Sequence, residues 1–423
     1  MSRRDRGSNA SGSIPDPDPD PDNDEPTPPF FNTTFSTHRV SPLYVGPEQL
    51  TNPRLEILAR RLRDTLVGDV VRGIQIGLES TDTPSGQVGP LKSVKLRWFR
   101  ANMVLGDEVG GAGHDEEDSV WDSLAESQKQ GLWIEILHEN AAYIALLLPS
   151  VGDAGKRMAT TQTWQMQPGG QAASHSNARE SHFIHLPLLL LRMPLPLKNV
   201  IGEWLSATFD CRVSKLALGT RTLVHVWEDW IRTVGVRSNG PDFVVTLAFN
   251  APLPDPSLDE EEGGSNQVGD SVEDTKPGLR SVDITIQPQD LRRFARAGKG
   301  LAQRPKVGSG VSWENDIRQR RRLAGGNSDD GWAWLSRESD TAASSQPFTD
   351  ALARYLDHHL ALNLFHPSVR IAQISCGGFV LASGRLKVVR QGDMSDDLSR
   401  AAWMFATRLG QRISGEALPA IFT

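Results

Sequence analysis

Residues 347–390 read PFTDALARYLDHHLALNLFHPSVRIAQISCGGFVLASGRLKVVR, and the fold class follows from this stretch. In its first part, apolar side chains recur at helical spacing, at Phe348, Leu352, Leu356 and Leu360. Charged and polar residues occupy most of the positions between them, as they do on the solvent side of a surface helix. The pattern therefore predicts one amphipathic helix that ends near Asn363.

The second part of the stretch predicts an antiparallel meander. Apolar and β-branched segments predict strands at about 369–375, 379–382 and 386–389. We expect Gly377 and Gly378 to supply the positive-φ pair of a tight hairpin between the first two strands. Leu386 alternates with Arg385 and Lys387, which predicts a sheet with one buried face and one cationic, wet face. A helix followed by such a meander favours an α+β fold.

The rest of the chain has the same mixture of elements. Strands are predicted at 30–45, 70–78, 91–105, 133–148, 242–249 and 281–286, and helices at 53–68, 197–207, 222–234, 289–297 and from residue 396 onward. Gly68 is the expected end of the first helix. In the last helix, Trp403 lies outside the apolar stripe that contains Leu398 and Phe405.

The length and composition predict two domains with unstructured additions. A chain of 423 residues is longer than one simple core supports, so we expect α+β domains, or lobes, at 29–235 and 236–423. Residues 1–28 contain alternating Pro and Asp and predict a disordered tail. Inserts are expected near 252–278 and 298–345. They agree with the hydrophobic content of 38%, which is low for a chain that folds throughout.

Composition and motifs exclude several classes of protein. Cys211 and Cys376 form neither a disulfide framework nor a zinc site, which favours a reducing compartment. The sequence has no apolar run long enough to span a membrane and no apolar core of a secretory signal, so we expect a cytosolic or nuclear protein. We expect no cofactor and no metal. The formal net charge of −7 argues against a protein dedicated to nucleic acid, but it does not exclude a local basic patch.

One segment, residues 292–322, is strongly basic. Such a block can neutralise phosphates and release counterions, although a solvated loop or a localisation signal explains it equally well. Trp313, Trp332 and Trp334 lie in or beside the block, and they either dock it onto the protein or insert into a partner. The candidate DNA-contact residues are Arg292, Arg293, Arg296, Lys299, Lys306, Arg318, Arg320, Arg321 and Arg322.

The sequence offers little that supports catalysis. Three histidines within residues 358–366 are close to Cys376 in the chain, but no third group is evident that would orient a Cys–His pair. Phosphate-binding loops, nucleophile elbows and His-Glu-x-x-His pairs are absent from the sequence. An enzyme or small-molecule domain with a pocket lined by Trp227, Trp230 or Trp332 is the alternative from another class. Core packing is the simpler role for Trp227 and Trp230.

Two stretches resemble a known family. The first is FFNTTFSTHRVSPLY at 30–44 with the helix that follows it and VGDVVRG at 67–73, which resembles the start of the fungal CENP-L family of inner kinetochore subunits. The second runs from LALNLFHP at 360–367 through CGGFVL at 376–381 to GRLK at 384–387. Together the two stretches bracket the chain from about residue 30 to residue 390.

The resemblance implies a non-enzymatic α+β protein with curved antiparallel sheets. It also implies that the protein is located in the nucleus, at the centromere and kinetochore. It implies pairing with a CENP-N-like subunit through the C-terminal sheet, work with other inner kinetochore subunits of the constitutive centromere-associated network, and contact with the centromeric nucleosome or DNA as part of a complex. A cationic groove shared by the two partners is also implied.

The residues themselves agree with an interface in the meander, because a meander can extend a sheet into a partner by edge pairing. A protein that binds nucleic acid alone is disfavoured, since aromatic and basic residues do not interleave on one strand. The candidate interface residues are Val369, Ile371, Ile374, Phe379, Val380, Leu381, Leu386 and Val388.

Overall fold

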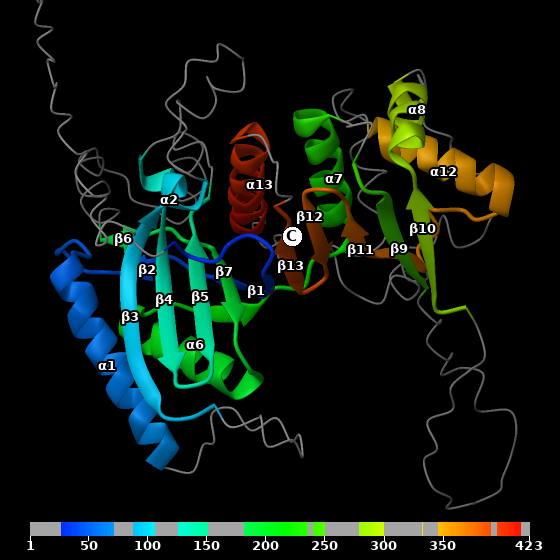
Figure 1. The fold of residues 1–423 in the computed structure, drawn as a ribbon. Coiled ribbons are helices and arrows are strands. Elements are labelled where there is room, and N and C mark those ends of the chain that lie inside the picture. The colour runs from blue at the N-terminus through cyan, green and yellow to red at the C-terminus, as the bar shows by residue number, and fades with distance from the viewer. Residues whose placement is uncertain are drawn as a thin grey trace, which may run out of the picture.

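The computed structural model describes residues 27–71, 88–105, 126–150, 182–235, 240–249, 279–299, 332, 346–390 and 396–415. Its helices are α1 (Asn52–Val71), α2 (Ala101–Leu105), α6 (Leu195–Phe209), α7 (Thr220–Val234), α8 (Pro288–Lys299), α12 (Pro347–Leu360) and α13 (Asp396–Gly415), with a short 3-10 helix η3 (Glu126–Gln128). Its strands are β1 (Thr34–Val40), β2 (Leu43–Tyr44), β3 (Leu91–Arg100), β4 (Gln130–His138), β5 (Ala142–Leu148), β6 (Phe183–Ile184), β7 (Leu188–Arg192), β8 (Val213–Lys215), β9 (Phe243–Phe249), β10 (Ser281–Ile286), β11 (Val369–Ser375), β12 (Phe379–Ala382) and β13 (Arg385–Val388). The predicted α+β class is confirmed (Figure 1).

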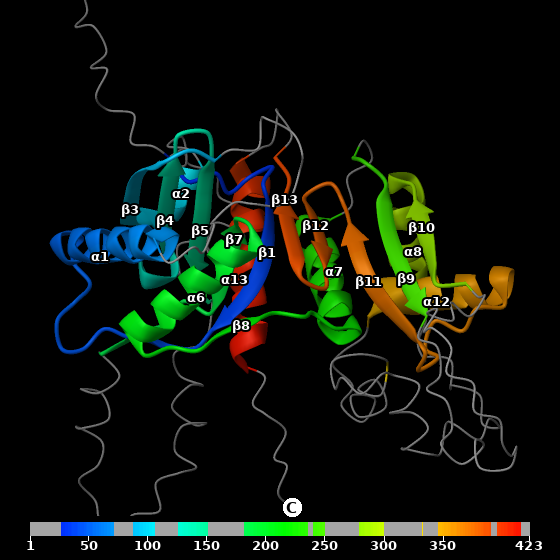
Figure 2. The ribbon, with the colours of Figure 1, turned by 90° about the horizontal axis from the view of Figure 1, so that it is seen from below.

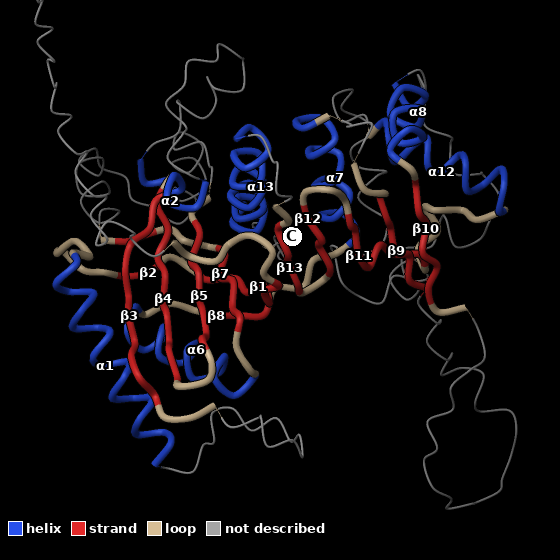
Figure 3. Tube along the Cα trace, viewed as in Figure 1, coloured by secondary structure: helices blue, strands red, loops and turns tan. Residues whose placement is uncertain are grey.

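Eleven strands form one antiparallel sheet, which runs as a continuous band through the molecule (Figure 3). The order is β10-β9-β11-β12-β13-β1-β7-β5-β4-β3, with β8 paired to β1, and β2 and β6 form a separate small sheet. The predicted meander is confirmed, because β12 pairs with both β11 and β13. The first strand, β1, lies between β13 and β7 and so joins C-terminal to N-terminal strands.

Helices cover both faces of the sheet in its N-terminal half. On one side, here named the α1 face, α1 and α6 pack on residues such as Leu96 and Leu189 (Figure 2). On the other side, the α13 face, α13 and α2 pack on residues such as Trp133 and Leu190. Because successive side chains of a strand point to opposite faces, a strand covered on both faces is apolar throughout. This explains the run of four buried leucines in β7.

The C-terminal half of the sheet has described helices on one face alone. There α7, α8, α12 and α13 lie on the α13 face, and the strands β9 to β13 turn their opposite side away from them (Figure 2). In β13, Leu386 and Val388 are buried whereas Arg385 is exposed. The predicted pattern of one buried and one cationic face is therefore confirmed for this strand.

Helix α13 lies over the middle of the sheet and is buried on several sides. Trp403 lies outside the apolar stripe of the sequence, yet its side chain is 0% exposed and belongs to the core. Trp403 packs against Phe30 and Phe99, while Phe405 on another side of the helix stacks on Phe379 with a centroid distance of 4.3 Å. A helix with neighbours on several sides buries more than one stripe, so periodicity alone underestimates its core.

The hairpin between β11 and β12 differs from the predicted geometry. Neither Gly377 nor Gly378 has a positive φ. A Cβ atom on Gly378 would lie 2.2 Å from Cζ2 of Trp230, which is closer than any real contact. Glycine is therefore required here by the close approach of the Trp230 ring from α7 and not by the turn type.

Several predicted boundaries were wrong. Helix α1 continues past Gly68, the segment 91–105 changes from strand to helix at Ala101, and the segment 133–148 is the two strands β4 and β5. Apolar residues continue past Gly68 and past Ala101, so the sequence pattern did not reveal the first two boundaries. The third boundary is marked by the polar run His138-Glu139-Asn140, which the single predicted strand passed over. Most of the predicted strand at 70–78 lies outside the described residues.

The division into domains at residue 235 stays a prediction, and any division must accommodate a sheet that β1 makes continuous. The predicted tail and inserts lie almost wholly outside the described residues. Among the described helices, none has both the length and the apolar character needed to cross a membrane.

Candidate interaction surfaces

The residues predicted to form the partner interface lie in the interior of the sheet. Strand β11 lies between β9 and β12, and β13 lies between β12 and β1, so the meander has no free edge. Apart from Val380, the predicted residues are at most 3% exposed and belong to the core beneath α7 and α13: Val369, Ile371, Ile374, Phe379, Leu381, Leu386 and Val388. Val380 alone points to the other side of the sheet and is half-buried.

The uncovered side of the same strands, here named the open face, is polar and cationic. Strand register places Val380 beside Lys387, and Arg385 lies on the same side of β13. Asp283, the acidic residue that β10 contributes to this face, accepts a hydrogen bond of 2.7 Å from Thr246 Oγ1–H. The open face consists of Val244, Thr246, Ala248, Ser281, Asp283, Thr285, Arg370, Gln373, Ser375, Val380, Ala382, Arg385 and Lys387.

The free edge of the C-terminal half is β10. It pairs with β9 on one side and has no described strand on the other. The Phe249 N–H donates to the Arg280 carbonyl at 3.0 Å, and hydrogen-bonded pairs alternate along an antiparallel ladder. The backbone groups of Ser281, Asp283 and Thr285 therefore point away from β9. Among the described residues, no strand pairs with the outward-facing main-chain donors and acceptors of these three residues.

Helix α8 follows β10 directly and presents three of the predicted DNA-contact residues. Arg292, Arg293 and Arg296 are all exposed on it, and Arg293 forms an ion pair of 2.9 Å with Asp290. The backbone of Lys299 ends the helix. The structure thus places three exposed arginines on the helix that follows the edge strand in the chain. The other predicted contacts, Lys306, Arg318, Arg320, Arg321 and Arg322, lie outside the described residues.

Trp332 docks onto the body of the protein. Its side chain is 5% exposed, its ring packs against Phe365 with a centroid distance of 5.0 Å, and its Nε1–H donates to the Val369 carbonyl at 3.2 Å. Of the two roles considered for this tryptophan, docking is the one that the structure shows. Trp313 and Trp334 lie outside the described residues.

A buried polar network joins α7 to the first turn of α12. The Glu228 carboxylate, 3% exposed, accepts hydrogen bonds from Thr349 N–H at 2.8 Å and Thr349 Oγ1–H at 2.7 Å. The same Thr349 oxygen accepts a bond of 2.9 Å from Trp227 Nε1–H. Gln346, at the N-cap position, makes no side-chain cap, so Glu228 supplies the acceptor from another helix. Burial raises the pKa of the Glu228 carboxyl, and the bonds from Thr349 oppose that rise.

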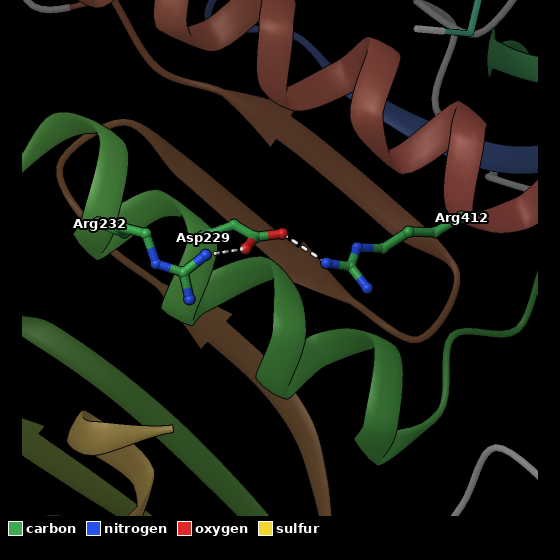
Figure 4. A network of polar contacts seen from close by, with 3 residues as sticks. All are labelled: Asp229, Arg232 and Arg412. Carbon is green, nitrogen blue, oxygen red and sulfur yellow. Dashed lines mark hydrogen bonds and ion pairs between the residues drawn. The ribbon is translucent and has the colours of Figure 1, made fainter. Parts of the chain in front are cut away.

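A second polar contact joins α7 to α13. Asp229 on α7 accepts a hydrogen bond from Arg412 of α13 and forms an ion pair with Arg232 of its own helix (Figure 4). Asp229 and Arg412 line a small recess together with Trp230 and Phe405. Its cavity volume of about 20 Å³ is room for about one water molecule. This recess is too small for a substrate. Trp227 and Trp230 are 0% and 9% exposed and belong to the core of the described chain.

The Cys–His hypothesis gains no support from the geometry. Burial raises the pKa of the Cys376 thiol to about 11, so the nucleophilic thiolate is disfavoured near neutral pH. The Tyr355 ring lies tilted beside His359 on α12, with 4.4 Å between ring centroids. His366 lies 2.6 Å from Ser368 Oγ within a local turn. Within the described residues, no group of His, Cys, Asp and Glu has the arrangement of a metal site.

Sequence reasoning missed the β10 edge and the Glu228 network. The edge had a weak signal, since Asp283 interrupts the β-branched run Val282–Ile286, as charges do on exposed edges. Glu228 had none, because an acid between two tryptophans on an amphipathic helix reads as a solvent-facing residue.

The comparisons with known proteins agree with the architecture. A family model described as CENP-L, Centromere protein L, matches residues 29–418. The match covers nearly all of the described chain, including both stretches that resemble this family. A search of curated proteins finds no match. A match over most of the chain, on an α+β fold with one long antiparallel sheet, leads to one conclusion: the chain belongs to the CENP-L family.

Proposed function

We propose that the chain pairs with a CENP-N-like subunit at the free edge of β10 and that the pair helps to link centromeric chromatin to the kinetochore. Family membership supplies the coarser part, because CENP-L proteins are structural subunits of the centromere and kinetochore. The nuclear location, the non-enzymatic role, the heterodimer and work with other inner kinetochore subunits belong to the proposal.

The observation that carries the proposal is the position of β10. Edge pairing requires a strand with one unpaired side, and the meander strands have neighbours on both sides. In the C-terminal half, β10 is the described strand that meets the requirement, through Ser281, Asp283 and Thr285. The interface thus stays in the C-terminal sheet but moves from the meander to its outer strand.

The cations near this edge support a shared DNA surface. A strand added to β10 would lie beside α8, where Arg292, Arg293 and Arg296 are exposed. The open face adds Arg370, Arg385 and Lys387 on the adjoining strands. Phosphate contacts from several such residues give affinity without sequence preference, which suits a subunit that contacts chromatin as part of a complex.

Proline at the edge tests the pairing directly. Asp283→Pro removes an N–H that points away from β9, so it blocks an added strand and leaves the β9–β10 ladder intact. We expect at least a tenfold loss of affinity for the separately purified CENP-N-like subunit, measured by titration calorimetry. The matched control is Thr246→Val, which removes the same side-chain hydrogen bond but keeps the edge N–H.

The control variant should bind as the parent does. Circular dichroism should show that both variants are folded. If folded Asp283→Pro binds with parental affinity, the partner does not pair at β10, and the exposed positions of the open face become the next candidates.

A further inference from the structure

Strand β3 lies at the end of the described strand order opposite to β10, and its charge is of one sign. Its sequence, LKSVKLRWFR, has four basic residues and no acidic one. Lys95 is exposed, while Arg97 lies over the Trp133 ring at 4.1 Å and donates a hydrogen bond of 3.0 Å to Glu135. Lysines on an edge strand ordinarily prevent pairing. A segment that pairs here must therefore bring negative charge.

The backbone of β3 alternates between its neighbour β4 and the free edge. The Ala101 N–H donates to the Lys129 carbonyl at 2.7 Å, which sets the alternation for the whole ladder. The backbone groups of Lys95 and Arg97 therefore bond to β4, and those of Leu96 and Trp98 point to the free edge. The side chains of β3 alternate between the two faces of the sheet. Those of Lys95 and Arg97 lie on the α13 face, and those of Leu96 and Trp98 lie on the α1 face.

We propose that the Pro–Asp repeat at residues 15–22 pairs with this edge of β3 as a parallel strand. In PDPDPDPD every second residue lacks an N–H, so the repeat can form a ladder on one side only, through its aspartates. A residue that precedes proline is restricted to extended conformations, which suits a strand. The prolines then face solvent, where a missing N–H costs nothing.

The point where the chain enters the fold sets the direction. Phe30 packs against Trp403 at 6.1 Å, and Phe99, next to the end of β3, packs against the same ring at 6.0 Å. The described chain thus starts near the C-terminal end of β3. Asp22 precedes Thr27 by five residues, a reach of roughly 17 Å. The C-terminal end of the repeat would then lie near the C-terminal end of β3. If the repeat follows the edge of β3, it therefore runs parallel to that strand.

Parallel pairing makes the charges match. In a parallel pair of strands, a residue whose N–H and C=O bond to the partner strand is in register with a partner residue whose own N–H and C=O point away from it. The aspartates would stand beside Lys95 and Arg97 on the α13 face, and the prolines beside Leu96 and Trp98. Opposite charges side by side on neighbouring strands stabilise the pair. The pattern of N–H groups and the pattern of charge agree, although neither depends on the other.

Residue-resolved hydrogen exchange on the full chain tests the proposal. The test variant changes Asp16, Asp18, Asp20 and Asp22 to Lys. We expect the Leu96 and Trp98 amides to exchange at least fivefold faster in this variant than in the parent, while the Arg97 amide, bonded to β4, is unchanged. The matched control changes Asp259, Glu260, Glu261 and Glu262 to Lys, which alters the net charge equally and should leave all three amides at parental rates.

A charge exchange separates pairing from a general electrostatic effect. Lys95→Glu should also speed exchange at Leu96 and Trp98, and its combination with the four-lysine repeat should restore the slow exchange. Equal exchange in the parent and the repeat variant would overturn the proposal, as would an equal effect of the control. Slow exchange that requires high protein concentration would also overturn it, because the repeat of a second copy would then be the occupant.

Discussion

Glu228 connects α7 to α12, and its removal should weaken the C-terminal half of the fold. Glu228→Ala leaves the N–H and O–H of Thr349 without their acceptor in a buried site. An unsatisfied buried donor costs about 1–3 kcal/mol. We therefore expect Glu228→Ala to lower the free energy of unfolding by about 3 kcal/mol. Glu228→Gln keeps an oxygen acceptor at the same place, so it should cost less than about 1 kcal/mol.

The pH dependence of the free energy of unfolding provides a second, independent test of the role of Glu228. Burial raises the pKa of the Glu228 carboxyl above its ordinary value, so the folded state favours the protonated form. The stability that this group contributes is fully present below the unfolded pKa and is lost as the pH rises through the folded pKa. The Gln variant has no such loss. Its stability relative to the parent should therefore increase between about pH 4.5 and the folded pKa.

Urea unfolding followed by tryptophan fluorescence and by far-ultraviolet circular dichroism measures both effects at a series of pH values. The slope of free energy against urea should be the same for all three proteins if the denatured states are alike. Two results would refute the reasoning. One is a Gln variant as destabilised as the Ala variant, and the other is a Gln variant that becomes relatively weaker as the pH rises.

Three further outcomes are expected. Gly378→Ala should destabilise the protein by about 2 kcal/mol in thermal unfolding, because the new Cβ overlaps the Trp230 ring; an unchanged melting temperature would mean that α7 shifts freely. Leu386→Asp should unfold the protein, whereas Val380→Asp should remain folded, and a folded Leu386→Asp would contradict the core position of this residue. Partner binding by folded Val380→Asp then reports whether the open face contacts the partner. Changing the three exposed arginines of α8 to Ala should reduce the slope of log affinity against log salt for DNA binding by the complex by about 3, and an unaltered slope would exclude α8 from the contact.

The sequence predicted local elements well where one pattern acted alone. The helix at 347–360 and the meander after it have a clear period of 3.6 followed by a period of 2, and both are confirmed. Prediction failed where tertiary contacts added a second burial constraint. Trp403 is buried because α13 has neighbours on several sides, and Gly378 is required by a ring from a helix far away in the chain. Neither contact leaves a trace in the periodicity of its own segment.

The candidate site shows the same division. The sequence identified the C-terminal sheet and the arginines of α8 as places of interest, and these assignments as contact sites stay predictions. It could not tell that β11 to β13 are interior strands, because strand order depends on pairing between distant segments. The α13 face of the meander is covered by α7 and α13, so residues such as Leu381 contact the core of their own chain.

By itself, the sequence determined the α+β class, the amphipathic character of elements such as α12 and β13, and the resemblance to one family, since these depend on neighbouring residues. Within the part of the chain that the structure describes, the tertiary structure decided which strands are edges and which face of the sheet has no helix on it. Those properties arise when β1 inserts between β13 and β7 and when β9 and β10 extend the sheet outward. A strand becomes an edge through the absence of a neighbour, and only the folded arrangement of the whole chain determines its neighbours.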